Sequence, residues 1–477
     1  MENNHKQPTF YFHDYETFGI HPALDRPAQF AGVRTDSDFN IIEEPLVIYC
    51  QQAQDYLPNP EAVLVTGITP QEANQKGICE AEFTRLIHQA FSEPNTCILG
   101  YNNIRFDDEV TRNILYRNFY DPYSYSWQNG NSRWDLLDVV RACYALRPDG
   151  INWPINEAGF ASFRLEHLTK ENNIAHENAH DAMSDVYATI AIAKLIKEKQ
   201  PKLFDYFFSL RNKNKVADLI DVVNMTPIVH VSGMLGSYRG NMSLVSPIAW
   251  HPLQNNAVIV CDLTGDIDLI IDLTVEEINE KLYTKTEDLE LNESRIPLKL
   301  IHINKCPIVA PQKTLLPENA KRFAIDLDQC LINQQKLLQC QKILQDKMRE
   351  LFTMHSDYSI NPDVDAQIYN GFLNNQDKSR CEMIRTTPIN LLNNISITFD
   401  DPRLATLFFR YKARNYPQTL TEQEQMIWKD YCRDKLNEPK IQDYLHTLEQ
   451  LAEIYMQQPE KLTIIKHLYN YCHYLVA

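Results

Sequence analysis

The spacing of apolar and polar residues along the chain predicts three regions. Up to about residue 200, short apolar runs that fit β-strands alternate with segments of helical periodicity, as in an α/β domain. This region ends at the polar segment 197–201, which closes with a proline. We expect a domain boundary there, because proline cannot continue a preceding helix.

Two regions of different pattern follow. The first is β-rich, with strand-like runs at 242–250, 257–261 and 298–303. The second begins near Asn361, is nearly free of glycine and is rich in Leu, Gln, Glu, Lys and Tyr, so we expect helices. Turns are expected near its prolines Pro402, Pro417 and Pro439. The predicted domains are an α/β domain over 1–200, a β-rich domain over 201–355 and a helical domain over 356–477.

The strand expected over 9–17 carries two acidic residues close together. Because side chains alternate between the faces of a strand, Asp14 and Glu16 point the same way. Two adjacent carboxylates on a central strand are unfavourable unless a cation neutralises them, and hard divalent ions prefer oxygen ligands. The pair therefore indicates a metal site. The alternative is an edge strand whose two acids are solvated.

Two later segments supply further groups of the same kind. Asp107 follows the apolar strand 96–99 after a polar turn, and α/β proteins commonly build sites beyond strand ends. Asp185 opens a helix over 186–196 on its small, apolar face, where a carboxylate needs a partner. His180 is expected at or before the first turn, from which an imidazole can reach the same pocket. By itself, His180 would be interpreted as a helix-capping or core histidine.

In order and spacing, these segments resemble the motifs of a known superfamily. Asp-x-Glu on the first strand, Asn-x-x-Phe-Asp after a later strand and His-x-Ala-x-x-Asp opening a helix are similar to those of the histidine-containing branch of the DEDD exonucleases. Other stretches resemble the bacterial exonuclease I family across essentially the whole chain: 100–113, 132–138, 145–148, 162–168, 231–234 and 302–307. The resemblance implies a ribonuclease H-like exonuclease domain followed by an SH3-like β-rich domain and an all-helical C-terminal domain.

The resemblance also implies a reaction. The chain would remove 5′-mononucleotides from the 3′ end of single-stranded DNA by two-metal-ion hydrolysis, acting in DNA repair and recombination. Asp14, Glu16, Asp107 and Asp185 would hold two Mg²⁺ ions. His180 would be the general base, because an imidazole with an ordinary pKa of about 6.5 accepts protons near neutral pH.

The same resemblance implies contacts with the DNA strand. Arg164 would touch the terminal nucleotide. The full substrate-binding set would be Glu16, Arg112, Tyr123, Trp127, Arg141, Phe163 and Arg164. Surface ion pairs are the alternative interpretation of the arginines, and core packing is the alternative for Phe163.

The charge balance agrees with a local DNA groove. The formal net charge of −17 argues against a protein that coats nucleic acid by bulk attraction. Between residues 112 and 147, however, five arginines accompany three acids and eight aromatic residues. Rings stack on unpaired bases and guanidinium groups fit phosphate oxygens, so this mixture suits single strands. We expect about half of these rings to be core residues instead.

Cysteine usage and the absence of targeting signals predict a cytoplasmic protein. The eleven cysteines are scattered without a Cys-x-x-Cys pair, which disfavours a zinc site or a disulfide framework. No apolar run approaches the ~20 residues of a membrane-spanning helix, and the first residues lack a secretion signal. The resemblance adds that the protein would be a monomer that binds single-stranded DNA. It would also bind the acidic C-terminal tail of the single-strand DNA-binding protein.

Two other functions fit parts of the pattern. A ribonuclease or proofreading exonuclease could use the same fold, but the two additional domains argue against it. A non-catalytic single-stranded DNA-binding protein or adaptor is the other alternative. It is disfavoured because all five residues of catalytic type are present.

Overall fold

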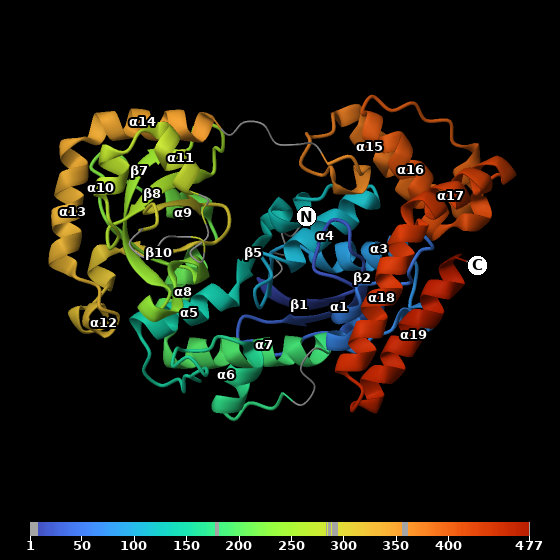
Figure 1. Cartoon of the computed structure of the whole chain (residues 1–477), viewed down its shortest axis with the longest axis horizontal. Coiled ribbons are helices and arrows are strands. Elements are labelled where there is room, and N and C mark those ends of the chain that lie inside the picture. The colour runs from blue at the N-terminus through green and yellow to red at the C-terminus, as the bar shows by residue number, and fades with distance from the viewer. Residues whose placement is uncertain are drawn as a thin grey trace, which may run out of the picture. The chain divides into compact units, whose positions relative to one another are not determined.

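The computed structural model of the protein describes residues 8–176, 181–282, 284, 288, 294–354 and 361–476. The chain forms two compact units (Figure 1). The first holds Met1–Ser132, His176–Ile190 and Ile360–Ala477, and the second holds Arg133–Ala175 and Ala191–Ser359. Both units are therefore discontinuous in sequence. The predicted domain limits at residues 200 and 355 remain a prediction.

A mixed sheet forms the centre of the first unit. Strand β1 (Thr9–Thr17) lies between β2 (Pro27–Thr35) and β4 (Thr96–Gly100), and β3 (Leu46–Tyr49) pairs with the other edge of β2. β1 is antiparallel to β2 and parallel to β4. β5 (Ser132–Asp135) begins at the last residue of the first unit.

The two faces of β1 differ as the alternating pattern predicts. Tyr11 and Tyr15 belong to a buried aromatic core together with Phe30 and Phe91. The Tyr15 and Phe30 ring centres are 4.9 Å apart. His13 shares this side: it is 2% exposed, and its Nδ1 lies 3.1 Å from the Leu99 carbonyl oxygen. His13 is therefore a structural residue, and the opposite face of β1 carries the two acids.

The helices of the first unit come from both ends of the chain. The N-terminal ones are α1 (Pro60–Thr66), α2 (Pro70–Lys76), α3 (Glu80–Phe91) and α4 (Asp107–Arg117). The C-terminal ones are α15 (Asn375–Thr386), α16 (Pro402–Asn415), α17 (Glu422–Lys435), α18 (Glu438–Ile454) and α19 (Pro459–Val476). Pro402 and Pro439 lie in the first turns of α16 and α18, where proline is tolerated.

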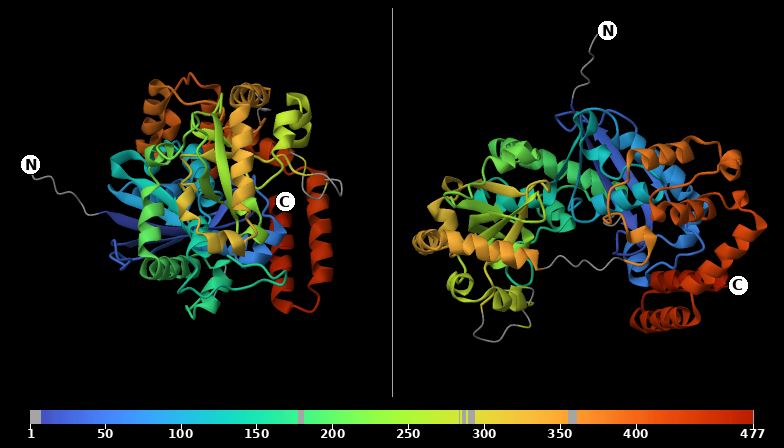
Figure 2. Two further views of the ribbon diagram at one scale, coloured as in Figure 1. Left: turned by 90° about the vertical axis from the view of Figure 1, so that its left-hand side faces the viewer. Right: turned by 90° about the horizontal axis from the view of Figure 1, so that it is seen from above.

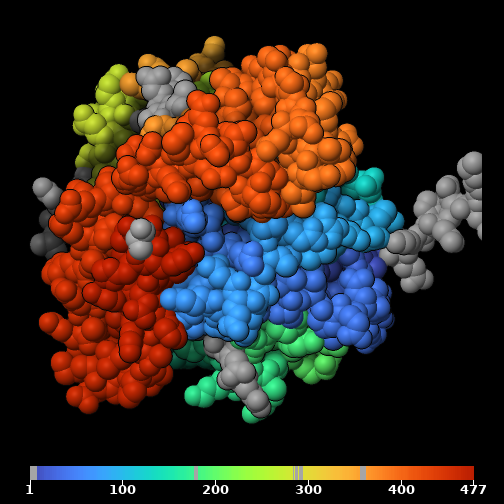
Figure 3. Space-filling view, turned by 90° about the vertical axis from the view of Figure 1, so that its right-hand side faces the viewer, coloured from blue at the N-terminus to red at the C-terminus, as the bar shows by residue number. Residues whose placement is uncertain are grey.

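The C-terminal helices share their core with the N-terminal region. Helices α18 and α19 run side by side, and α19 packs on α1 and α2 (Figure 2). Leu448 and Leu468 are buried in one cluster with Phe18 and Val63. In Figure 3, the orange and red C-terminal residues directly border the blue N-terminal ones. The helical region is thus part of the same compact unit as the sheet.

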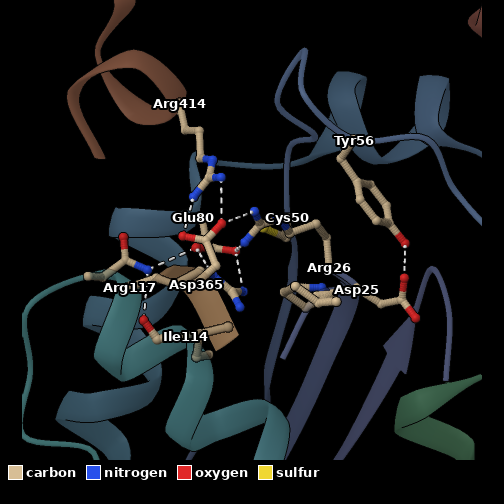
Figure 4. A network of polar contacts seen from close by, with 12 residues as sticks. Asp25, Arg26, Cys50, Tyr56, Glu80, Ile114, Arg117, Asp365 and Arg414 are labelled. Carbon is tan, nitrogen blue, oxygen red and sulfur yellow. Dashed lines mark hydrogen bonds and ion pairs between the residues drawn. The ribbon is translucent and has the colours of Figure 1, made fainter. Parts of the chain in front are cut away.

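A buried network of charges joins the same two regions (Figure 4). The Arg414 guanidinium contacts Asp55 at 2.7 Å and Asp365 at 2.6 Å. Arg26 lies 3.2 Å from Asp365 and 3.6 Å from Glu80. Burial would raise the pKa of the Glu80 carboxyl, but Arg117 and Arg26 outweigh it and lower the pKa to about 2. These acids are therefore held in their charged form by the arginines around them.

We expect Arg414→Ala to destabilise the protein by about 3–5 kcal/mol, because breaking a buried ion pair leaves its partners without compensation. Burial alone would raise the pKa of Asp365, but Arg414 and Arg26 hold it well below its ordinary value. Such a group stabilises the fold above its unfolded-state pKa, and this contribution is lost as the pH falls through the folded-state pKa. The variant should show a lower unfolding free energy in urea at pH 7 and should unfold at a higher pH on acidification.

Arg433→Ala is the matched control. Arg433 pairs with Asp430 in α17, but both side chains are mostly exposed. Its removal should change the free energy of unfolding by less than about 0.5 kcal/mol. An Arg414→Ala variant that is as stable as this control would show that the buried network does not hold the unit together.

The second unit is centred on an antiparallel sheet of order β10-β6-β7-β8-β9. Its strands are β6 (Ile228–Val231), β7 (Met242–Trp250), β8 (Ala257–Asp262), β9 (Leu298–His302) and β10 (Ile308–Pro311). The three predicted runs are β7, β8 and β9, whereas β6 and β10 are short and were not expected. The buried residues of β7 and β8 place the core of this unit in the middle of the sheet.

The second unit also contains helices, most of them short. They are α5 (Leu136–Leu146), α6 (Leu165–Glu171), α8 (Pro201–Ser209), α9 (Lys213–Ala217), α10 (Asp268–Asp272), α11 (Val275–Leu282), α12 (Pro317–Arg322), α13 (Leu327–Gln339) and α14 (Gln341–Thr353). α7 (Ala182–Lys199) continues from the first unit into the second. In the described residues, no helix combines the length and apolar character needed to cross a membrane.

Candidate active site

Three carboxylates converge where β1 meets the start of α7. Asp14 and Glu16 lie on one face of β1, and Asp185 lies in the first turn of α7. One oxygen atom from each side chain lies within 4.8 Å of the others. Glu16 is buried, and the other two are half-buried. The alternation along β1 and the start of α7 thus bring together acids that are up to 171 positions apart in the sequence.

Asp107 completes the acidic cluster. The chain leaves β4 at Gly100, passes through a polar turn in which Asn102 has a positive φ of 69°, and enters α4 at Asp107. The backbone N–H of Tyr15 donates a hydrogen bond of 3.2 Å to Asp107 Oδ1. The carboxylate of Asp107 is therefore fixed to the strand residue that separates Asp14 from Glu16.

The electrostatics of the cluster favour a bound cation. Burial raises the pKa of Glu16 to about 9, and the charges of Asp185 and Asp107 add to this effect. Burial and the nearby Asp107 likewise raise the pKa of Asp14 well above its ordinary value. Carboxylates held so closely repel one another when they are charged, and in the absence of a metal ion only protons can neutralise them. Four carboxylates with oxygen donors suit hard divalent ions, so these residues fit a metal centre.

The loop before α7 adds a contact that sequence reasoning missed. His176 Nε2 lies 2.6 Å from Asp185 Oδ1, and the His176 side chain is almost fully buried. Nothing in the sequence marks His176, because a lone histidine four residues before a motif has no periodic or spacing signal. The predicted general base, His180, lies outside the described residues. Asp181 Oδ2 accepts a hydrogen bond from the Ser184 N–H, so Asp181 supports the start of α7.

In the first unit, two of the predicted DNA-contacting residues lie together. The Arg112 guanidinium is 2.6 Å from Glu109 Oε1 and 5.5 Å from the centre of the Tyr123 ring. The Arg112 Nη1 atom also lies 3.5 Å from the Tyr369 hydroxyl. Trp127 follows in the same loop and is 63% exposed. An ion pair and an aromatic contact therefore both position Arg112.

The other predicted DNA-contacting residues belong to the second unit. The Arg141 guanidinium is 2.6 Å from Asp138 and 5.9 Å from the centre of the Phe163 ring. Gly233 lies so close that a Cβ atom there would be 3.0 Å from Arg141 Cζ, so a side chain at this position would press on the guanidinium. The Arg164 side chain, directly before α6, is 73% exposed. Phe163 is half-buried and contacts the rings of Tyr144 and Trp153, which are also half-buried.

Two acids near these residues lie at the start of α5. Asp135 is the N-cap residue, and its side chain accepts a hydrogen bond of 3.0 Å from the Leu137 N–H. Asp135 is therefore a cap of α5, whereas Asp138 lies in its first turn and pairs with Arg141.

Three family models match the chain in succession. They are an exonuclease model over residues 11–193, an exonuclease I SH3-like domain over residues 211–354 and an exonuclease I C-terminal domain over residues 362–475. Together they cover almost the whole chain. The chain belongs to the exonuclease I family. The predicted ribonuclease H-like, SH3-like and helical regions are thereby confirmed as a fold class.

Characterised relatives share this full length. The chain is 55% identical to the exodeoxyribonuclease I of Haemophilus influenzae over 467 residues, which cover 98% of each chain. It is 54% identical to the exodeoxyribonuclease I of Escherichia coli over 476 residues, which cover 100% of both chains. The aligned region therefore includes the segments that carry the acidic cluster and those that flank them.

Solved structures of family members have the same fold. The exonuclease I of E. coli in complex with a dA16 oligonucleotide superimposes with a TM-score of 0.97 at 54% identity, covering 98% of this chain and 100% of that one. A zinc-bound form of the E. coli exonuclease I complex with single-stranded DNA superimposes with a TM-score of 0.96 at 54% identity, covering 99% and 100%. A complex of SSB and exonuclease I with the inhibitor CFAM gives a TM-score of 0.92 at 53% identity, covering 98% and 100%.

The raised pKa of Glu16 predicts how the metal-free protein responds to pH. A folded-state pKa of about 9, above the ordinary 4.5, means that the folded protein binds more protons than the unfolded chain between these values. Stability should therefore fall as the pH rises from about 5 to 9 in EDTA. In Glu16→Gln the fall should be smaller, as measured by urea unfolding at pH 5, 7 and 9. Glu61→Gln, on an exposed position of α1, is the control and should follow the wild-type curve.

Proposed function

We propose that the protein is a 3′-to-5′ exodeoxyribonuclease that degrades single-stranded DNA to 5′-mononucleotides with two Mg²⁺ ions, in DNA repair and recombination. The observation that carries this proposal is the acidic cluster of Asp14, Glu16, Asp107 and Asp185 in a member of the exonuclease I family. The relatives named exodeoxyribonuclease I align over the full length, so the proposal extends to the whole protein.

The side chains at the cluster have different roles in the proposed reaction. The four acids would hold the metal ions, which would supply an activated water and stabilisation of the leaving oxygen in an in-line displacement. Glu16 is the buried member and also belongs to the proposed substrate-binding set, in which Arg164 contacts the terminal nucleotide. His180 accepts the proton of the attacking water, because a carboxylate committed to a cation is a weaker base than a free imidazole.

Each unit has its own set of residues proposed to contact the DNA strand. In the first, Arg112, Tyr123 and Trp127 offer a guanidinium held in place and rings that can stack on unpaired bases. In the second, Arg141, Phe163 and Arg164 offer a similar combination. The E. coli relative binds a dA16 oligonucleotide, which supports a single-stranded substrate.

A protein partner follows from the same relatives. The complex of SSB and exonuclease I supports binding of the single-strand DNA-binding protein, and we propose that its acidic C-terminal tail is the segment bound. We further propose a monomer that works in the cytoplasm. Eleven free cysteines agree with a reducing compartment.

One assay tests the function against both alternatives. The purified protein is incubated with Mg²⁺ and with DNA or RNA strands labelled at the 5′ end, and the products are separated by length. We expect DNA strands that shorten from the 3′ end and release 5′-mononucleotides. Preferred cleavage of RNA would indicate a ribonuclease instead. Binding without cleavage in any divalent ion would indicate a non-catalytic single-strand binding protein.

A further inference from the structure

His176 contacts the acidic cluster without being one of its acids. Its Nε2 atom lies 2.6 Å from Oδ1 of Asp185, which follows nine positions later in the chain. The side chain of His176 is 3% exposed, and that of Asp185 is 19% exposed. Neither the metal assignment nor the family motifs give His176 a role.

The hydrogen bond between these two side chains has one possible direction when Asp185 is ionised. A carboxylate oxygen only accepts hydrogen bonds, so the Nε2 atom of His176 carries the hydrogen and donates it. A neutral imidazole is sufficient, because each neutral ring has one N–H group. Hydrogen bonds to an ionised acceptor are short and strong, which agrees with the distance of 2.6 Å.

Other contacts fix the backbone around Asp185. Its N–H donates a hydrogen bond of 3.0 Å to the carbonyl oxygen of Asp181. The N–H of Ala182 donates a hydrogen bond of 3.3 Å to Oε1 of Gln29, which lies opposite Glu16 in the pairing of β2 with β1. The start of α7 is therefore tied to the strand beside Glu16. These contacts fix the position of the Asp185 backbone but not the direction of its carboxylate.

The direction of the Asp185 carboxylate decides whether the cluster can share an ion. One of its oxygen atoms lies within 4.8 Å of an oxygen of Asp14 and of Glu16. Without a cation, repulsion between the charged carboxylates favours rotamers that turn Asp185 away from the other two. The hydrogen bond from the buried His176 ring opposes this rotation.

We propose that His176 is a positioning residue of the metal centre, which holds the Asp185 carboxylate toward Asp14 and Glu16 before a divalent ion binds. Carboxylates that ligate metals are themselves hydrogen-bonded, and loss of such a partner typically costs about 10- to 100-fold in metal affinity or activity. His176 acts through Asp185 and is distinct from His180, the proposed general base. The inference rests on the proposed function, because the ion concerned is the one used in hydrolysis.

Two substitutions separate the hydrogen bond from the shape of the ring. His176→Phe keeps a ring in the buried site but has no N–H donor. His176→Gln brings an amide N–H close to the place of Nε2 and can restore the bond. Binding of Mn²⁺, an ion that suits carboxylate ligands, is followed by its EPR signal in the absence of DNA. We expect His176→Phe to raise the Kd for Mn²⁺ by about 10- to 100-fold, and His176→Gln to recover most of this loss.

The dependence of cleavage on Mg²⁺ is the second measurement. In His176→Phe, the half-maximal rate should require about 10- to 100-fold more Mg²⁺, whereas the rate at saturating Mg²⁺ should approach that of the wild type. Affinity for single-stranded DNA in EDTA should not change, because His176 does not belong to the proposed DNA-contacting set. A defect in folding would instead lower the DNA affinity and the saturated rate together.

His446→Phe is the matched control. His446 lies 3.8 Å from Glu449 in α18, and both side chains are mostly exposed. Loss of this histidine–carboxylate pair should leave the Mn²⁺ affinity and the Mg²⁺ dependence unchanged. Circular dichroism and urea unfolding in EDTA check that each variant is folded. Should His176→Phe not fold, His176→Asn takes its place, because its polar side chain is too short to place an N–H at the position of Nε2.

The outcomes separate this inference from the proposed function. If the wild type binds no Mn²⁺ and cleaves no DNA, the proposed function fails. If the wild type does both, but a folded His176→Phe has the same Mn²⁺ affinity and Mg²⁺ dependence, the positioning role alone is overturned. Tighter binding of Mn²⁺ by His176→Phe would also overturn it, because His176 would then compete with the ion for Asp185.

Discussion

Asp14→Asn is expected to abolish DNA hydrolysis in a protein that remains folded. The substitution keeps the shape of the side chain but removes a charged ligand from the cluster of Asp14, Glu16 and Asp185. Metal ions contribute several kcal/mol to such reactions, so we expect a loss of about 10³-fold or more. Release of mononucleotides from labelled single strands in Mg²⁺ measures the effect.

The stability of the same variant distinguishes a catalytic from a structural loss. Asp14 lies among repelling carboxylates, which raise its pKa well above the ordinary range. Its replacement should leave the free energy of unfolding in EDTA unchanged or higher. Asp443→Asn, on an exposed position of α18, is the control for a lost surface charge and should cleave normally. Cleavage near the wild-type rate by Asp14→Asn would refute the metal assignment.

His180→Ala is expected to slow hydrolysis by ~10²–10⁴-fold, the usual effect of removing a general base. The four acids are untouched, so binding of the metal ions and of the DNA strand should be largely preserved. Single-turnover cleavage at saturating enzyme gives the rate, and anisotropy in EDTA gives the affinity.

His446→Ala, whose side chain in α18 is mostly exposed, is the matched control and should behave as the wild type. The pH dependence adds a second test, since a base with a pKa near 6.5 makes the wild-type rate fall below that pH. An activity loss in His180→Ala equal to its loss of affinity would make His180 a binding residue rather than the base.

Local patterns of the sequence predicted much of the candidate site. Alternation along β1 placed the Tyr11 and Tyr15 rings in the core and Asp14 and Glu16 on the other face, as the structure has them. The strand and the polar turn likewise placed Asp107 just beyond the end of β4, where the structure has it at the start of α4. These predictions succeeded because each depends on neighbouring residues and on the fixed geometry of one element.

Contacts between distant segments could not be predicted in this way. Of the eight rings between residues 112 and 147, four are buried, and only the packing decides which: Tyr116, Phe119, Tyr125 and Trp134. The hydrogen bond between the Tyr369 hydroxyl and the Glu109 carboxylate joins residues 260 positions apart. No spacing rule connects such positions, because the fold of the intervening chain determines where they meet.

The discontinuous first unit has a consequence for synthesis of the protein. Its sheet is translated first, but Asp365 and Arg414, which neutralise buried charges of that sheet region, are translated near the end. The second unit is complete at Ser359, before these residues leave the ribosome. At about 5–20 residues per second, the emerging sheet therefore waits about 10 to 60 seconds for its ionic partners. During this interval it would be a client for chaperones, and a ribosome that stalls before Asp365 would release a chain without a stable nuclease.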